Sequence, residues 1–223
     1  MRNVLINVLL LLTVSVSGQG LIATTMVTPT PAASDEWLYE DDYDLYSTGT
    51  LDGKGDWVET AGSDFTIADA GGGDNVVSPS TATTEILAYY NQSIDDDMWV
   101  QVSYEGAQSG RGLGPATNIQ SATGYGYGFY STTTATYLMR RSSAGDTELA
   151  SGTAVSPTAI LGLKSHGDTL ICYVDGAIYT GISGDGKVTD DGIYKQTGGY
   201  AGVWGYGSSV DVIIDEWKAK NVE

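Results

Sequence analysis

The segment from Leu161 to Trp217 constrains the fold of this chain more than any other stretch. It places short apolar runs on both sides of His166-Gly167-Asp168, and a further run after the pair Asp175-Gly176. Asp-Gly between β-branched and aromatic residues is a strong hairpin signal, because a type I′ turn needs a positive φ angle at both central residues. The segment therefore predicts two consecutive β-hairpins, then a loop rich in Gly and Asp, and then two more strands at 199–205 and 210–217.

The composition favours the same kind of structure for most of the chain. The 223 residues include 30 glycines and 15 tyrosines but only 2 phenylalanines, a mixture typical of many short strands joined by tight turns. No long helical periodicity follows residue 34. Since β-sandwiches of this length commonly form one undivided domain, we expect one all-β domain over residues 35–223.

The order of strands and turns resembles the concanavalin A-like lectin/glucanase superfamily, in particular its laminin G-like domains. The similarity covers residues 35–220 and lies in the two hairpins, the Gly-rich strand at 199–205 and the closing strand Ile213-Ile214-Asp215-Glu216-Trp217. The resemblance implies an antiparallel jelly-roll β-sandwich. It does not by itself assign a function, because one fold hosts many functions.

The amino-terminal segment has two interpretations. Residues 1–20 contain one basic residue and then an apolar run that ends in small residues, which is the layout of a secretory signal peptide. If retained, the same segment is expected to be an anchoring arm that packs against a neighbouring subunit, in a homo-oligomer or on a capsid. Residues 21–34 include Pro29 and Pro31 and are predicted to be a Thr/Pro linker.

The charge of the chain argues against one class of partner. There are 28 acidic residues against 10 basic ones, a formal net charge of −18, which repels phosphate backbones and makes nucleic acid an unsuitable ligand. The same charge fits a solvated extracellular surface or the binding of cations.

Acidic residues open the predicted domain. Glu40, Asp42 and Asp44 stand at alternate positions, so in a strand their carboxylates would share one face. The pattern is superficially similar to the active-site strand of family 16 glycoside hydrolases, where two carboxylates serve as nucleophile and acid/base. That strand lies in the middle of such domains, however, and its third acid is Glu rather than Asp.

The resemblance also implies a structural calcium ion that ties the first strand to the last. Asp215 matches the acid of the closing strand, and the early partners would be Asp42, Asp44 and the carbonyl of Gly49. Hard oxygen ligands of this kind suit Ca²⁺. The alternative is that Asp215 only ends the strand and the early acids face water.

Aromatic residues supply the candidate glycan-binding surface, because sugar C–H faces stack on flat rings. Tyr125, Tyr127 and Phe129 alternate with Gly126 and Gly128, so the three rings should line one face of a strand and the glycines should leave the other face open to close approach. Further candidates for the same concave sheet are Trp99, Arg111, Tyr137, Arg140, Trp204 and Tyr206. Alternating aromatic residues in a sandwich also occur in the core, and the sequence leaves open which set faces inward.

Three functions follow from these features. The first is a non-catalytic carbohydrate-binding or adhesion module displayed outside the cell. The second is a structural protein of a virion surface, such as a head decoration or fibre subunit, anchored by residues 1–34. The third is a glycoside hydrolase or lyase, against which stands the lack of a carboxylate pair in a strand in the middle of the domain.

Overall fold

Both predicted hairpins are present. The computed structural model of the protein describes residues 36–60, 64–80, 85–92, 94–105, 112–206 and 213–222. β12 (Leu161–His166) and β13 (Thr169–Val174) pair antiparallel, and β13 also pairs antiparallel with β14 (Ala177–Ile178). Asp175 and Gly176 have φ angles of 50° and 78°. Both are positive, as the type I′ turn requires, so the prediction is confirmed.

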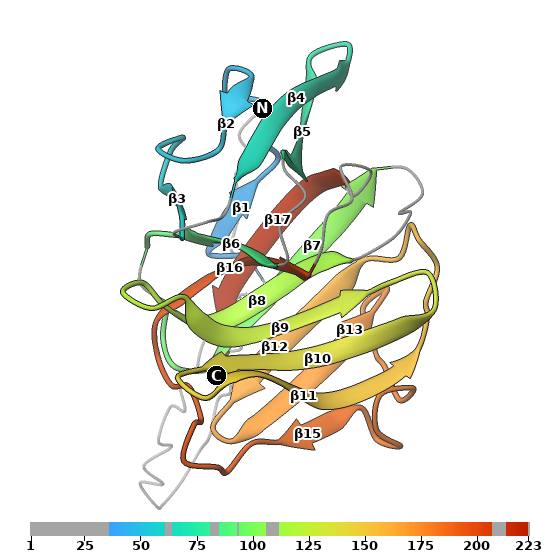
Figure 1. Cartoon of the computed structure of the whole chain (residues 1–223). Helices are drawn as coiled ribbons and strands as arrows, with labels where there is room; N and C mark the ends of the chain where they lie inside the picture. Colours follow the sequence, from blue (N-terminus) through green and yellow to red (C-terminus); the bar gives the residue numbers. More distant parts are fainter. Residues whose placement is uncertain are drawn as a thin grey trace, which may run out of the picture. The chain divides into compact units, whose positions relative to one another are not determined.

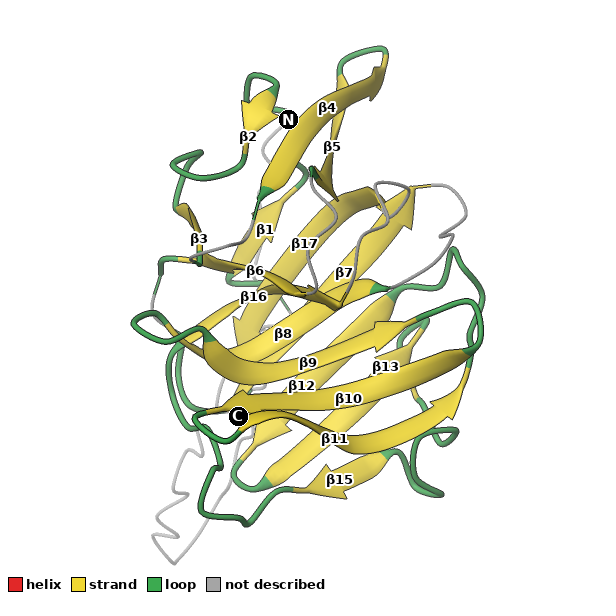
Figure 2. Cartoon of the chain, in the orientation of Figure 1, coloured by secondary structure: helices red, strands yellow, loops and turns green. Residues whose placement is uncertain are grey.

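The strands form two antiparallel sheets stacked as a sandwich (Figure 1). The ten-stranded sheet also contains β1 (Tyr39–Asp41), β2 (Gly49–Thr50), β4 (Phe65–Gly71), β5 (Asp74–Pro79), β7 (Met98–Glu105), β15 (Lys187–Thr189) and β17 (Ile213–Asn221). The seven-stranded sheet contains β3 (Trp57–Glu59), β6 (Glu85–Tyr90), β8 (Leu113–Gln120), β9 (Tyr125–Ser131), β10 (Ala135–Ser142), β11 (Gly145–Thr153) and β16 (Tyr200–Tyr206). Figure 2 shows only strands and loops among the described residues, so the predicted all-β jelly-roll class is confirmed.

The core lies between the two sheets. Trp57 of β3 and Trp217 of β17 are both fully buried, with ring centroids 5.1 Å apart and ring planes at 70°. The indole N–H of Trp217 donates a hydrogen bond of 3.2 Å to the carbonyl of Gly202 in β16. Trp217 therefore joins the two sheets both by packing and by a hydrogen bond that satisfies its buried polar atom.

The first described strand pairs with the last. Tyr39 of β1 lies opposite Ala219 of β17, and Asp41 lies opposite Trp217. β1 ends at Asp41, and Tyr43 follows with a φ angle of 62°. The expectation that residues 40, 42 and 44 share one strand face is therefore wrong, because the strand ends before Asp42.

Asp41, rather than its neighbours, is the acid that organises this turn. Its Oδ2 accepts hydrogen bonds of 2.7 Å from the hydroxyl of Tyr46 and from the indole N–H of Trp57. Its Oδ1 accepts a bond of 2.8 Å from the backbone N–H of Tyr43. Such charge-assisted bonds are stronger than neutral ones, so Asp41 holds the first strand onto the seven-stranded sheet.

The predicted signal peptide or arm and the linker, residues 1–34, lie outside the described residues. In the part of the chain that the structure describes, no helix has the length and apolar character needed to cross a membrane.

Candidate functional site

The residues proposed from sequence as one glycan-binding surface do not share one face. Trp99 lies in β7 of the ten-stranded sheet, whereas Tyr125, Tyr127, Arg140 and Trp204 belong to the seven-stranded sheet. Two more candidates add nothing, because Arg111 lies outside the described residues and only the backbone of Tyr206, in β16, is described. Each side chain therefore has to be considered in its own place.

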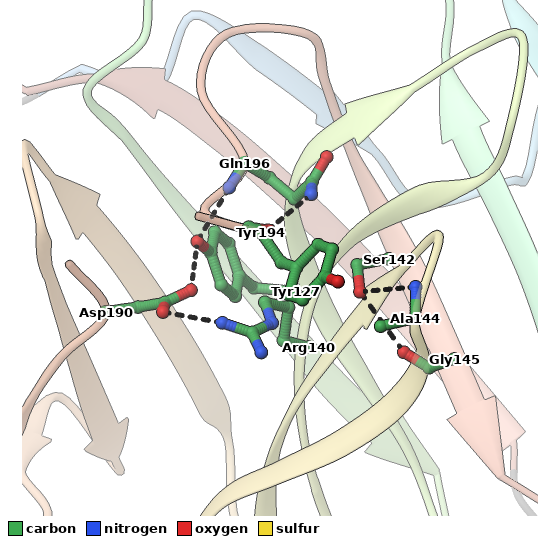
Figure 3. Close-up of polar contacts among 8 residues, drawn as sticks. All are labelled: Tyr127, Arg140, Ser142, Ala144, Gly145, Asp190, Tyr194 and Gln196. Atoms are coloured by element: carbon green, nitrogen blue, oxygen red, sulfur yellow. Dashed lines mark hydrogen bonds and ion pairs between the residues drawn. The ribbon is translucent and has the colours of Figure 1, made fainter. Parts of the chain in front are cut away.

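Tyr127 and Arg140 point into the interior of the sandwich and meet Asp190 (Figure 3). They are direct neighbours on β9 and β10. The guanidinium Nη1 of Arg140 lies 2.7 Å from Asp190 Oδ1, and the hydroxyl of Tyr127 donates a bond of 2.7 Å to Asp190 Oδ2. The same hydroxyl accepts a bond of 2.8 Å from the backbone N–H of Gln196.

This group is buried and almost saturated with hydrogen bonds. Tyr127 is 2% exposed, Asp190 6% and Arg140 9%. Burial, followed by the bond to Asp190, raises the pKa of the Tyr127 hydroxyl above its usual value. Arg140 Nε is the one buried polar atom of this group that lacks a partner among the described residues, and the ring of Tyr194 covers the guanidinium at 5.8 Å. This clasp, the contacts of Tyr127 and Arg140 with Asp190 and Gln196, fixes the segment 190–196 to β9 and β10. It leaves little exposed surface on these side chains for a ligand.

Asp190 was not predicted from the sequence, because no pattern marks its place in the loop after β15. Tyr127 and Phe129 face the core, since both belong to the main buried cluster. The glycines between them allow other residues to approach the outer face closely. A Cβ atom on Gly128 would lie 2.3 Å from Cε3 of Trp204, so the indole covers that position.

Trp204 belongs to a second apolar cluster, on the outer face of the seven-stranded sheet. It packs there with Leu87, Tyr89, Ala116 and Ile119, and only 2% of its surface is exposed. Trp204 Nε1 is buried without a partner among the described residues. A ring this deeply covered has no flat face available to a sugar, so Trp204 supports the sheet rather than presenting a platform.

Trp99 is in a different situation, on the outer face of the ten-stranded sheet. Its ring stacks on Tyr173 of β13, with centroids 5.1 Å apart and planes at 29°. It also contacts Trp37, just before β1, at 5.2 Å and 59°. The ammonium of Lys220 lies 4.9 Å from the Trp99 ring and 5.1 Å from the Trp37 ring. All three rings are half-buried. We call Trp37, Trp99 and Tyr173 the aromatic platform.

Gly162 makes room for this platform. It lies opposite Tyr173 on β13, and on β7 it lies opposite Gln101, two residues along the strand from Trp99. A Cβ atom on Gly162 would meet Trp99 Nε1 at 3.1 Å and Tyr173 Cβ at 3.2 Å. The absence of a side chain at Gly162 therefore lets the two rings approach each other over the sheet. Alternation in β13 could have indicated Tyr173 from sequence, but Trp37 precedes the first strand and carried no signal.

The residues proposed for calcium occupy the turn after β1 and the last strand. Asp44 Oδ1 accepts a bond of 2.8 Å from the backbone N–H of Asn75, and Asp42 Oδ1 accepts one of 3.2 Å from the N–H of Asp44. Asp215 lies in β17, and Gly49 begins β2. The described residues hold no group of three or more His, Cys, Asp or Glu side chains placed to share a metal ion. Calcium at this place stays a prediction.

Comparison with known proteins identifies the fold. No model of a known protein family matches the chain, and no curated protein matches it either. A Bacillus subtilis protein of unknown function with a galectin-like fold shares 12% identity over 83% of this chain and 96% of its own, with a TM-score of 0.58. The Bacteroides ovatus mixed linkage glucan PUL GH16, solved in complex with a G4G4G3G product, shares 10% identity over 82% and 99%, with a TM-score of 0.52.

These similarities show that the chain has a concanavalin A-like jelly-roll fold, as its sequence indicated. At such low identity they carry no residue roles over to this chain. Function has to be argued from the surfaces of this molecule.

Proposed function

We propose that this protein is a non-catalytic glycan-binding module displayed outside the cell, and that the sugar stacks on the aromatic platform. The observation that carries the proposal is the contact of three half-exposed rings, Trp37, Trp99 and Tyr173, on the outer face of one sheet. Signal-like residues 1–20 and the charge of −18 support display outside the cell.

A platform of this kind suits a sugar for physical reasons. Large aromatic side chains normally bury most of their surface, and contiguous rings left in contact with water mark binding surfaces. Trp99 and Tyr173 stand on β7 and β13, the two strands that flank β12, and their rings stack on each other, so little side-chain freedom remains to be lost on binding. The flat C–H face of a pyranose replaces water over such rings without requiring a deep pocket.

The composition of the other sheet favours binding over hydrolysis. The three central strands of the seven-stranded sheet, β8, β9 and β16, contain no aspartate or glutamate. Glycoside hydrolysis generally needs two carboxylates separated by about 5–10 Å. A sugar lying across these strands would therefore meet no carboxylate from them to act as acid or nucleophile.

The test is a panel of soluble polysaccharides, titrated into the purified protein by calorimetry and examined for reducing ends afterwards. We expect at least one ligand that binds without being cleaved, and a loss of binding of about 10-fold or more in Trp99→Ala, since a stacked aromatic contributes about 1–2 kcal/mol or more. Tyr194→Ala removes an exposed ring that lies over Arg140 and is not part of the platform, so this variant should bind normally.

Circular dichroism and melting curves establish that both variants are folded. Equal binding by Trp99→Ala and the parent protein would refute the platform. The release of reducing ends would refute the non-catalytic assignment.

A further inference from the structure

A row of lysines crosses the same face as the aromatic platform. The residues paired side by side across β15, β13, β12, β7 and β17 are Lys187, Ile171, Lys164, Trp99 and Lys220. Lysine thus alternates with an apolar residue across five adjacent strands. We call Lys187, Lys164 and Lys220 the basic row.

The basic row is unusual for this chain. Three of its ten basic residues lie in one line, although the chain as a whole carries a net charge of −18. In the described part of the molecule, neither Lys164 nor Lys187 forms an ion pair. Lys218, one row away, lies 2.9 Å from Glu216 and 3.7 Å from Glu40. The positive charge of Lys218 is therefore balanced within the protein, whereas Lys164 and Lys187 have no acidic partner among the described residues.

Spacing and surroundings define what such a ligand should be. Neighbouring strands lie about 4.8 Å apart, so successive lysines of the row are separated by about 10 Å. Between them stand the apolar side chain of Ile171 and the ring of Trp99. A complementary ligand is extended, carries negative charges at intervals rather than continuously, and presents apolar faces between them.

We propose that the basic row and the aromatic platform together bind an acidic polysaccharide, one built from hexuronate sugars. The pyranose faces stack on Trp99 and Tyr173, and the sugar carboxylates pair with Lys164 and Lys187. This inference rests on the proposed function, since it names the class of glycan that the platform takes.

Nucleic acid fits the same surface less well. Double-stranded DNA carries one charge per about 1.7 Å of its axis, far denser than one lysine per about 10 Å, and the acidic remainder of the protein repels such a polyanion.

The experiment measures binding to three hexuronate polymers, polygalacturonate, alginate and hyaluronan, by calorimetry. Fully methyl-esterified polygalacturonate is the neutral match with the same backbone, and single-stranded oligo-dT is a polyanion without pyranose rings. We expect one of the acidic polymers to bind about 10-fold or more tightly than the neutral ester. Raising the salt from about 0.05 M to about 0.5 M should weaken this binding, because exposed charges are screened.

Variants locate the charges. Lys164→Gln and Lys187→Gln should each weaken binding about 2- to 5-fold, and the double variant more, as expected for exposed ion pairs. Lys54→Gln removes the same charge at a position away from the row, where the ammonium donates a hydrogen bond to Ser47, and should bind normally.

The outcomes separate this inference from the proposed function. Equal binding of acid and ester, with binding still lost in Trp99→Ala, overturns the inference and leaves the glycan-binding module standing. Binding of oligo-dT as tight as that of the acidic polymers also overturns the inference. The absence of binding to every polysaccharide overturns both.

Discussion

The substitution Tyr127→Phe removes a single oxygen atom from the buried group around Asp190. The lost hydroxyl donates to Asp190 Oδ2 at 2.7 Å and accepts from the N–H of Gln196 at 2.8 Å. A hydrogen bond to a charged group contributes about 1.5–3 kcal/mol, and a buried donor left without an acceptor costs about 1 kcal/mol or more. We expect the free energy of unfolding to fall by about 2–4 kcal/mol.

In a domain of this size, 1 kcal/mol changes the melting temperature by about 3 °C. The variant should therefore melt roughly 6–12 °C below the parent in a calorimetric scan. Tyr125→Phe is the matched control, because it makes the same chemical change on the same strand at a half-exposed ring. Its stability should change by less than about 0.5 kcal/mol. A Tyr127→Phe protein that melts with the parent would refute the view that this clasp stabilises the fold.

Other predictions concern pH, packing and metal. Burial is the largest cause that raises the pKa of the Tyr43 and Tyr127 hydroxyls. The unfolded chain therefore loses these protons near pH 10, while the folded chain keeps them. The free energy of unfolding should fall as the pH rises above about 10. A phenolate absorbance titration complete before unfolding would contradict this. Gly128→Ala places a methyl group against Trp204 and should cost about 1–3 kcal/mol, with a shift in tryptophan emission; unchanged emission and stability would be evidence against the contact. If calcium binds at Asp215, EDTA should lower the melting temperature, and an unchanged value removes that site.

Local turn chemistry explains which parts of the fold could be predicted. Asp175 and Gly176 determine a hairpin by themselves, because positive φ angles are required at both positions and few residues accept them. The sheet to which each strand belongs could not be predicted in this way. It depends on pairing between distant segments, such as β7 with β17, which no local pattern encodes.

The candidate site was predicted less well for the same reason. Trp99 and Trp204 are equally aromatic in sequence, but β7 and β16 lie in different sheets, and only Trp99 is left half-exposed. In β9, alternation correctly placed Tyr127 and Phe129 on one face, but which face is the core follows only from the position of the second sheet. The acids at 40, 42 and 44 were considered as neighbours on one face of a strand, whereas β1 ends at Asp41 and a turn follows.

The most direct test of the glycan-binding platform observes the indole N–H signals of the five tryptophans by NMR. The protein is titrated with short oligosaccharides of whichever polysaccharide in the panel binds. We expect the signals of Trp37 and Trp99 to shift, while those of the buried Trp57, Trp204 and Trp217 stay in place. Shifts confined to Trp204, or no shift in Trp37 and Trp99 at saturation, would contradict it.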